Sequence, residues 1–205
     1  MRNRNHFFVL LIFILIMPTI QAQIGIRVGA DLSTFYFSES VDLDTKHKFG
    51  LGGGIYYKHM VNNNFSIQPE LNFIQMGTKF EENDEEGSIS LHYLQLPILA
   101  KYDFGNMEAI NIFVQGGPYV GYGIGKVELE YCFDGECDVE EINYDSSGEE
   151  APKPLDFGLQ LGLGVNINKN ISIDDRYILG LQNLNAEDEG SIKNRAIFVS
   201  VGYTF

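Results

Sequence analysis

The sequence has no tryptophan, only two cysteines and six prolines, and 14 basic residues against 28 acidic ones. The resulting net charge of −14 excludes a protein that neutralises nucleic-acid phosphates, so no nucleic-acid partner is expected. Beyond the N-terminal region no run of ~18 apolar residues occurs, which excludes a helical membrane protein. What the chain does have is 22 glycines, 15 phenylalanines and 11 tyrosines, a composition that excludes coiled coils and disordered chains.

The N-terminus has the pattern of a secretory signal peptide. Two arginines precede an unbroken apolar stretch, Phe7–Met17, and the small residue Ala22 follows a few positions later. The apolar stretch is about half of the ~20 residues that a membrane-spanning helix needs. We therefore predict a signal peptide over residues 1–22, cleaved after Ala22, and a single domain over residues 23–205.

Apolar residues alternate with polar or small ones in eight segments after the cleavage site. The clearest is 155–168, in which leucine, phenylalanine, valine or isoleucine occupies every odd position from Leu155 to Ile167. The other segments are 24–33, 48–57, 65–73, 94–104, 110–124, 171–180 and 196–205. A period of two places one residue set on each face of a strand, so the sequence predicts an all-β protein of eight strands.

The connections between these segments alternate in length. The long ones are 38–46, 78–88, 127–152 and 184–193, and short turns such as 62–64 and 168–170 separate them. The four long connections hold 21 of the 28 carboxylates. Alternating short turns and long loops are typical of an up-and-down barrel in an outer membrane, with the chain termini on the side of the short turns.

The polar face of the predicted strands decides between lipid and water outside the barrel. It carries mostly glycine, serine, asparagine and glutamine, which is too little charge for a surface in water. Small residues with scattered ions suit the packed interior of an eight-stranded barrel. We predict an eight-stranded antiparallel transmembrane β-barrel with a side-chain-filled lumen in the outer membrane of a Gram-negative bacterium; the alternative is a soluble, lipocalin-like binder.

Several motifs resemble one family of small barrels. They are Gly25–Ser33, Gln68–Leu71, Tyr93–Tyr102, Gly116–Gly121, Tyr177–Leu181 and Val201–Phe205. In their order and spacing they are similar to the PorT-like outer-membrane β-barrel proteins, and the resemblance covers the whole predicted mature chain. It implies an outer-membrane barrel. The family's namesake takes part in protein secretion, and no functional residue is carried over.

Charged residues on the polar face should share the barrel interior. They are Arg27, Asp31, Glu70, Lys101, Asp156, Asp174 and Arg176. Near-balanced charge in a narrow lumen favours a packed ion-pair network, with a conduction path or a ligand site as the alternative. No enzyme is expected, because no nucleophile, base and orienting residue stand together in the sequence, and no cofactor or metal site is indicated.

Cys132 and Cys137 flank an Asp-Gly pair in the longest connection. Asp-Gly favours a tight turn, and the compartment outside the inner membrane is oxidising. We predict a disulfide that staples the tip of a hairpin.

The chain ends in an aromatic pair on one strand face, Tyr203 and Phe205. This ending resembles the signal that the barrel-assembly machinery reads in its client proteins. A final strand with aromatic residues at the membrane boundary would have the same sequence, and both interpretations can hold.

Two acidic features interrupt the pattern. Asp175 falls on the apolar face of segment 171–180, and we expect a rim position or a bulge there. The acidic runs 81–86 and 187–189 are expected to be solvated loops, with binding of divalent cations that bridge lipopolysaccharide as the alternative.

The sequence thus predicts a structural or interaction protein of the outer membrane with acidic extracellular loops. Its expected partners are outer-membrane lipid, lipopolysaccharide, the barrel-assembly machinery and a surface or secretion-system protein. The alternatives are a component of a secretion apparatus and a small channel or transporter.

Overall fold

The computed structural model describes residues 22–37, 45–82, 85–105, 110–133, 136–144, 152–185 and 190–205. The predicted signal peptide lies outside the described residues apart from Ala22, and so do Asp134, Gly135 and the run 187–189. The strands are β1 (Ala22–Phe37), β2 (Thr45–Met60), β3 (Phe65–Glu82), β4 (Glu85–Asp103), β5 (Asn111–Gly123), β6 (Val127–Phe133), β7 (Glu136–Ile142), β8 (Leu155–Asn166), β9 (Ile171–Gly180) and β10 (Ile192–Thr204). No helix in these ranges is long and apolar enough to cross a membrane.

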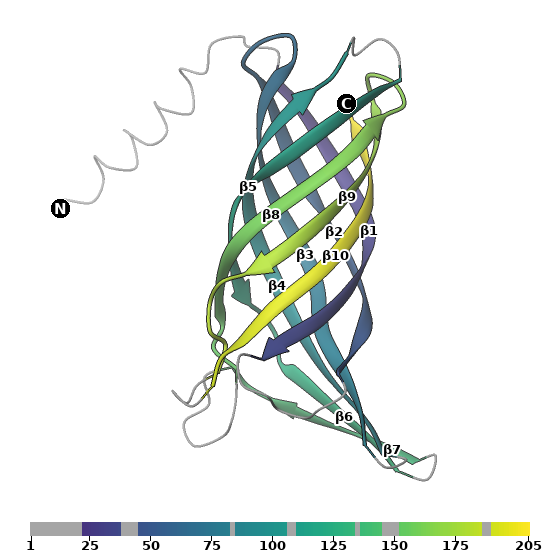
Figure 1. Ribbon diagram of the computed structural model, residues 1–205, viewed down its shortest axis with the longest axis vertical. Coiled ribbons are helices and arrows are strands. Elements are labelled where there is room, and N and C mark those ends of the chain that lie inside the picture. The colour runs from purple at the N-terminus through teal and green to yellow at the C-terminus, as the bar shows by residue number, and fades with distance from the viewer. Residues whose placement is uncertain are drawn as a thin grey trace, which may run out of the picture.

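Eight of the strands close into an antiparallel barrel (Figure 1). Its order is β1, β2, β3, β4, β5, β8, β9 and β10, and β10 pairs back with β1 from Gly25↔Thr204 to Phe37↔Ile192. Closure gives every barrel strand two neighbours, so that backbone groups in the wall are paired within the sheet. The predicted eight-stranded antiparallel barrel is confirmed.

Short turns close one end of the barrel, which we call the turn rim. The side-chain oxygen of Asn62 accepts hydrogen bonds from the backbone N–H groups of Asn64 and Phe65, at 3.0 and 2.9 Å. Asn168 does the same for Asn170 and Ile171, both at 2.8 Å. Asparagine favours such turns because its side chain substitutes for a backbone acceptor. The start of β1 and the end of β10, where the barrel's chain begins and ends, both lie at this rim (Figure 1).

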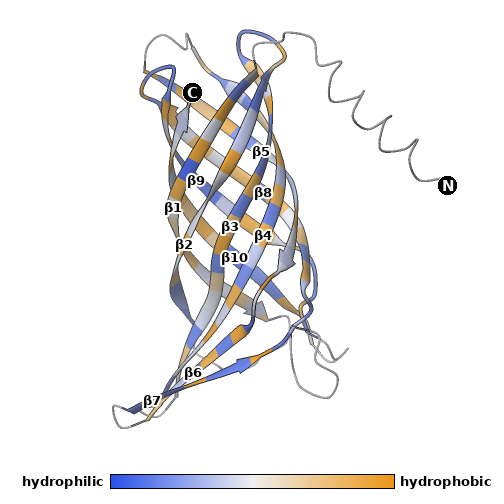
Figure 2. Cartoon of the chain, turned by 180° about the vertical axis from the view of Figure 1, so that it is seen from behind, coloured by the Kyte–Doolittle hydropathy of each residue, from blue (hydrophilic) through white to orange (hydrophobic). Residues whose placement is uncertain are grey.

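The wall is apolar outside, and its inward face carries polar and small residues as well as a buried group of apolar ones. Figure 2 shows the alternation along each strand as hydrophobic and hydrophilic bands. Val28, Leu161 and Leu163 point outward and are 66%, 60% and 60% exposed. Glycines make room inside: a Cβ at Gly50 would lie 2.6 Å from a carboxylate oxygen of Asp31. An apolar exterior over a crowded interior is the arrangement of a barrel in lipid.

Two of the predicted long loops contain strands instead. The expected loop 78–88 is the end of a hairpin, because β3 and β4 stay paired as far as Glu82↔Glu85. The expected loop 127–152 contains the hairpin β6–β7, and β6 also pairs with the start of β4, from Glu86↔Cys132 to Ser90↔Glu128. These strands are rich in acidic residues and show no apolar alternation, because a strand beyond the membrane needs no apolar face. The pairing was therefore not predicted.

The end of β3, the start of β4, β6 and β7 form a four-stranded sheet that extends beyond the barrel, at the bottom of Figure 1. We call this sheet the extension, and the barrel end that carries it the loop rim. The extension therefore replaces what the sequence indicated as two independent loops.

Asp175 is neither at a rim nor on a bulge, so that expectation was wrong. The registers of β9 with its two neighbours run without a break, and Asp175 stands opposite Leu163 on β8 and Val199 on β10. It is exposed on the outward face near the middle of β9. The strand period dictates this position, because its neighbours Asp174 and Arg176 both point inward and are buried.

Candidate functional site

A four-membered ion-pair cluster crosses the barrel interior. Arg176 donates to Glu70 from both terminal nitrogens, at 2.8 and 3.1 Å, and its Nε donates to Asp174 at 2.7 Å. Arg27 binds Glu70 at 3.2 Å and Asp174 at 3.1 Å. Two cations thus alternate with two anions, and all four residues are at most 3% exposed. Buried charges of this kind require such pairing.

Neutral side chains saturate the carboxylates of this cluster. Gln68 and Asn72 donate to Glu70 at 2.6 and 2.8 Å, and Gln115 donates to Asp174 at 3.0 Å. Gln68 and Asn72 lie two residues to either side of Glu70 on β3, which puts all three on the inward face. The period of the strand therefore assembles the hydrogen-bond shell of the ion pairs.

Three other residues of the predicted network lie apart from this cluster. Lys101 donates to Asn166 at 3.2 Å, and its Nζ lies 3.3 Å from the centre of the Phe113 ring. Asp156 accepts hydrogen bonds from Tyr119 and Asn194, at 3.0 and 2.9 Å. Neither Asp156 nor Asp31 takes part in an ion pair with the described residues, although both are buried.

Sequence reasoning missed a second charged group near the turn rim. The ammonium of Lys58 lies 3.5 Å from the carboxylate of Asp103, which also accepts from Asn166 at 2.6 Å. Asp103 lies on the polar face of the predicted segment 94–104, whereas Lys58 lies one residue beyond the segment 48–57. Continuing that alternation by one residue would have placed both side chains on the inward face.

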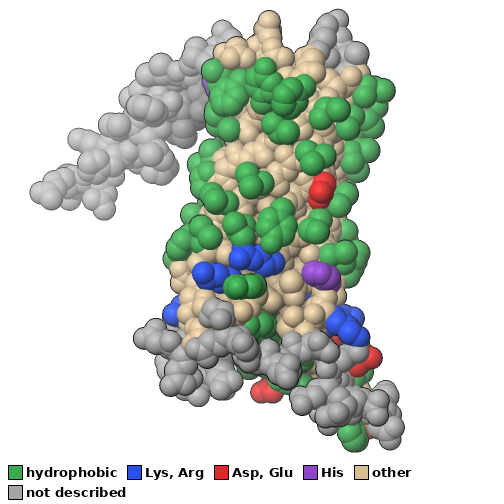
Figure 3. All heavy atoms as spheres, viewed as in Figure 1, with side chains coloured by type: hydrophobic (Ala, Val, Ile, Leu, Met, Phe, Trp, Pro, Cys, Tyr) green, Lys and Arg blue, Asp and Glu red, His purple; other side chains and the backbone are tan. Residues whose placement is uncertain are grey.

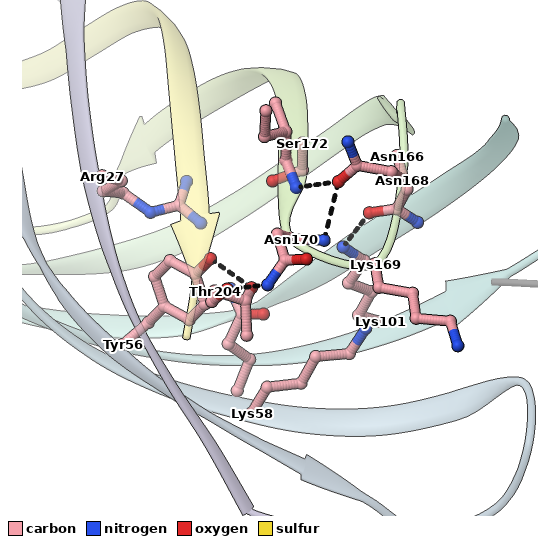
Figure 4. Close-up of a pocket in the computed structure, with 12 residues that line it drawn as sticks. Arg27, Tyr56, Lys58, Lys101, Asn166, Asn168, Lys169, Asn170, Ser172 and Thr204 are labelled. Carbon is pink, nitrogen blue, oxygen red and sulfur yellow. Dashed lines mark hydrogen bonds between the residues drawn. The ribbon is translucent and has the colours of Figure 1, made fainter. Parts of the chain in front are cut away.

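Described residues line two small cavities, one at each end of the barrel. The larger, of about 70 Å³, lies toward the loop rim and is bordered by Lys48, Gln75, Met76 and His92 among others. A cavity of about 10 Å³ near the turn rim is lined by Arg27, Lys58, Lys101 and the turn 168–170 (Figure 4). A volume of ~10–15 Å³ is what a single water needs. This cavity is cationic but too small for a solute.

An apolar cluster fills the other half of the interior. Its buried members are Phe35, Ile74, Met76, Leu91, Tyr93, Tyr119, Val127, Ile178, Leu184, Ala196 and Phe198. The alternation in the sequence places apolar residues on the outward face only, so it does not predict this cluster. The available signal was the set of places where apolar residues are consecutive, such as 73–74, 177–179 and 197–199, because there both faces of the strand are apolar.

The hairpin β6–β7 and Tyr144 after it cover this apolar cluster at the loop rim. Val127 is fully buried in the cluster, and Leu129, Ile142 and Tyr144 pack against it. The Tyr144 hydroxyl donates to the carbonyl of His92 at 3.2 Å and accepts from the His92 N–H at 3.1 Å. Burial raises the pKa of Tyr144 to about 12, so the hydroxyl keeps its proton at neutral pH.

A disulfide joins Cys132 to Cys137, as predicted. These residues stand directly opposite each other on β6 and β7, with Cα atoms 4.1 Å apart. The bond closes the tip of the hairpin beyond the end of the barrel and fixes the register of its two strands.

One face of the extension combines aromatic and acidic side chains. Tyr131 stands opposite Asp138, and Phe133 stands opposite Glu136, so these four side chains share a face. The Tyr131 and Phe133 side chains are 53% and 67% exposed. Glu140, which is also exposed, continues the same row opposite Leu129. We call these residues the acidic face.

The predicted assembly signal lies at the turn rim. The rings of Tyr203 and Phe205 are 5.2 Å apart, edge to face, and both point outward. The backbone N–H of Phe205 donates to the carbonyl of Ile24 and so ties the end of the chain to the start of β1. The position fits a membrane-boundary pair.

A closed apolar-walled barrel with a packed interior, short turns at one rim and an extension at the other defines an integral outer-membrane β-barrel protein. The family described as "Outer membrane protein beta-barrel domain" matches residues 16–185, and the chain belongs to this family. The protein is therefore located in a Gram-negative outer membrane, with the loop rim on the extracellular side.

Solved outer-membrane barrels are similar to the chain in overall outline. OprG of Pseudomonas aeruginosa is 12% identical, with 91% of this chain and 97% of that one covered and a TM-score of 0.49. Ail, the attachment invasion locus protein of Yersinia pestis, is 17% identical, with 91% and 100% covered and a TM-score of 0.46. The outer membrane enzyme PagL is 14% identical, with 87% and 98% covered and a TM-score of 0.45. No curated protein matches the sequence.

Proposed function

We propose that the protein is a non-conducting barrel that holds the extension above the outer membrane, where the acidic face binds a cationic partner. The observation that supports this most directly is the contrast between an interior that holds a buried ion-pair cluster and a buried apolar cluster and an extension whose aromatic and acidic side chains are exposed. The barrel acts as the anchor, and the extension provides the interaction surface.

The acidic face suits a lysine- or arginine-rich segment. Its carboxylates attract cations over about one Debye length, roughly 8 Å in physiological salt. Tyr131 and Phe133 provide exposed rings over which a cationic side chain can pack. The disulfide limits the loss of conformational entropy on binding, because it holds the two strands in register before a partner arrives.

Binding of a fluorescent oligolysine peptide to the full-length protein in detergent tests this proposal. The double variant Asp138→Asn/Glu140→Gln should bind roughly tenfold more weakly, because each exposed charge contributes modestly. The control Glu128→Gln/Glu141→Gln removes the same charge from the opposite face of the hairpin. Equal losses in the two variants would show that only net charge matters and would refute a specific face.

The proposed absence of conduction has its own test. Planar-bilayer recordings of the purified wild-type protein should show no stable open state, because ionic and apolar layers both close the interior. A reproducible single-channel conductance would make the channel alternative the better one.

Processing and assembly complete the proposal. Cleavage after Ala22 would leave Gln23 at the start of β1, and mass spectrometry of the mature N-terminus tests it.

Deletion of Phe205 should lower the amount of protein inserted in the outer membrane, because the last aromatic of the assembly signal is lost. Unchanged outer-membrane levels of the deletion variant would refute that role.

We also propose that the chain belongs to the PorT-like group of outer-membrane barrels. The strand motifs Gly25–Ser33, Tyr93–Tyr102 and Val201–Phe205 support this membership, and the secretion role of the group's namesake makes a secretion complex one candidate for the partner. Co-purification of periplasmic or inner-membrane secretion proteins with the full-length chain would favour such a complex over a soluble cationic partner.

A further inference from the structure

β7 is the edge strand of the extension. Among the described residues it pairs with β6 on one side and with no strand on the other, and it is the last strand in the order of the sheet. Every residue from Glu136 to Glu141 is exposed. The extension stands beyond the apolar wall, and Figure 3 shows that charged side chains replace the hydrophobic surface toward this end of the molecule. The free edge of β7 therefore faces water and not lipid.

The distance between the two cysteines shows which backbone groups point to this free edge. In an antiparallel pair, opposite residues with Cα atoms about 4.5 Å apart exchange no backbone hydrogen bonds, whereas those about 5.5 Å apart exchange two. The Cα atoms of Cys132 and Cys137 are 4.1 Å apart, so the N–H and C=O of Cys137 point away from β6. The register between β6 and β7 has no break, so Val139 and Glu141 follow the same rule. Each of these three β7 residues directs one donor and one acceptor to the free edge.

β7 has few of the features that prevent edge strands from pairing. Proline, lysine and β-bulges commonly protect an exposed edge. The strand Glu136–Ile142 has neither proline nor lysine, and its register with β6 has no bulge. Four of its seven residues are acidic. Like charges directly opposite each other are unfavourable, so this edge disfavours a second copy of β7 and suits a basic strand.

The two faces of β7 define the alternation that a partner strand needs. Asp138 and Glu140 lie on the acidic face, whereas Val139 points to the opposite face. Residues directly opposite each other on paired strands share a face. Basic residues opposite Asp138 and Glu140 would therefore alternate with a β-branched residue opposite Val139. Only that intervening residue would exchange backbone hydrogen bonds with β7, because Val139 directs its N–H and C=O to the free edge.

We propose that β7 binds an extended segment with a basic residue at every second position, which joins the extension as a fifth strand. The segment pairs antiparallel with β7, as every other pair of strands in the extension does. Backbone hydrogen bonds to Cys137, Val139 and Glu141 provide affinity, and the carboxylates of the acidic face select the basic positions. This inference rests on the function proposed for the acidic face, and it specifies that the cationic partner binds as a strand.

Two peptides that differ only in the position of backbone methyl groups test this inference. Both have the fluorescently labelled sequence Lys-Thr-Lys-Thr-Lys-Thr-Lys, with N-methyl groups on two threonines in one and on two lysines in the other. Binding to the full-length protein in detergent is compared with that of the unmethylated peptide. Methylated threonines should weaken binding about tenfold, because their amides face β7, whereas methylated lysines should change it less than about twofold. Equal effects of the two modifications would refute strand addition.

A proline variant tests the same contact on the protein. Val139→Pro removes the N–H that points to the free edge, at a kind of position where edge strands accept proline. It should bind the unmethylated peptide about tenfold more weakly, whereas the matched control Val139→Thr keeps the N–H and should bind as the wild type does. Unchanged binding by Val139→Pro would refute pairing at this edge, provided that the Cys132–Cys137 disulfide is intact by mass spectrometry.

The two proposals can fail separately. If Asp138→Asn/Glu140→Gln weakens peptide binding and the position of the methyl groups has no effect, the acidic face is correct and strand addition is wrong. If the methyl groups act as expected and the double variant binds normally, β7 adds a strand without help from the acidic face, and the selection of basic residues is wrong. A complete lack of binding by the unmethylated peptide would overturn both proposals.

Discussion

The two halves of the barrel interior close it by different means. Toward the turn rim, Arg27, Glu70, Asp174 and Arg176 fill the space with paired charges, whereas toward the loop rim an apolar cluster around Leu91 fills it. A charged layer depends on each partner, because removal of one leaves another buried and uncompensated. An apolar layer depends on volume, so it tolerates substitutions that keep the same size. The same strand period thus carries two kinds of core.

The largest effect should come from the charged half. Glu70→Gln leaves Arg27 and Arg176 with one carboxylate between them and should lower the free energy of unfolding by about 3–5 kcal/mol. Asp31→Asn is the control, because Asp31 is equally buried but takes part in no ion pair among the described residues. Urea unfolding in lipid vesicles measures both. Similar losses in the two variants would remove the distinction between paired and unpaired charges.

A substitution pair at Leu91 tests the apolar half. Leu91→Ala should cost about 3 kcal/mol through the cavity that it leaves, and Leu91→Met should cost less than about 1.5 kcal/mol because it keeps the volume. Leu91 is fully buried in the cluster. The same urea experiment gives both values. If Leu91→Met lowered the free energy of unfolding as much as Leu91→Ala does, the apolar half would depend on the exact shape of its side chains and not only on their volume.

Removal of the disulfide tests whether the hairpin β6–β7 is part of the apolar half of the interior or only covers it. Cys132→Ser/Cys137→Ser should destabilise the hairpin by about 2 kcal/mol, because the short closed loop no longer restricts the open chain. Hydrogen exchange should therefore rise in β6 and β7 while the eight barrel strands stay protected. A matching rise in β8 or β9 would mean that the hairpin is part of the core and not its cover.

The smallest effect contrasts the interior with the exterior. Asp175→Leu should raise the free energy of unfolding by about 1 kcal/mol, because an acidic side chain on the lipid face of a barrel is unfavourable. Leu163→Ala, on the neighbouring strand at the same level, is the control and should lower the free energy of unfolding slightly. A loss of stability in Asp175→Leu would show that Asp175 contacts another polar group inside the membrane.

The sequence predicts the wall well and the interior only in part. Alternation placed Arg27, Glu70, Asp174 and Arg176 on one face, but their pairing depends on closure, since Arg27 and Asp174 are 147 residues apart. Period alone could not separate Lys101 from that cluster, because depth along the barrel is set by strand tilt and register. The apolar cluster was missed because an apolar residue in a membrane strand was taken to face lipid.

The extension was missed for a related reason. Its strands Glu136–Ile142 and Glu85–Ser90 consist largely of acidic and small residues, which in a soluble context indicate a loop. Backbone pairing with β6 and the buried side chains at its base stabilise it, and neither contribution shows as alternation. The cysteine spacing alone marked the hairpin.

The extension also constrains how the barrel reaches its final position. A chain that enters the membrane from the periplasmic side keeps its turn rim and termini behind and must carry the acidic sheet through the hydrocarbon layer. Each ionised carboxylate resists that passage, and the disulfide makes the hairpin tip travel as a closed loop. The barrel therefore occupies its final position only when the extension has crossed the membrane.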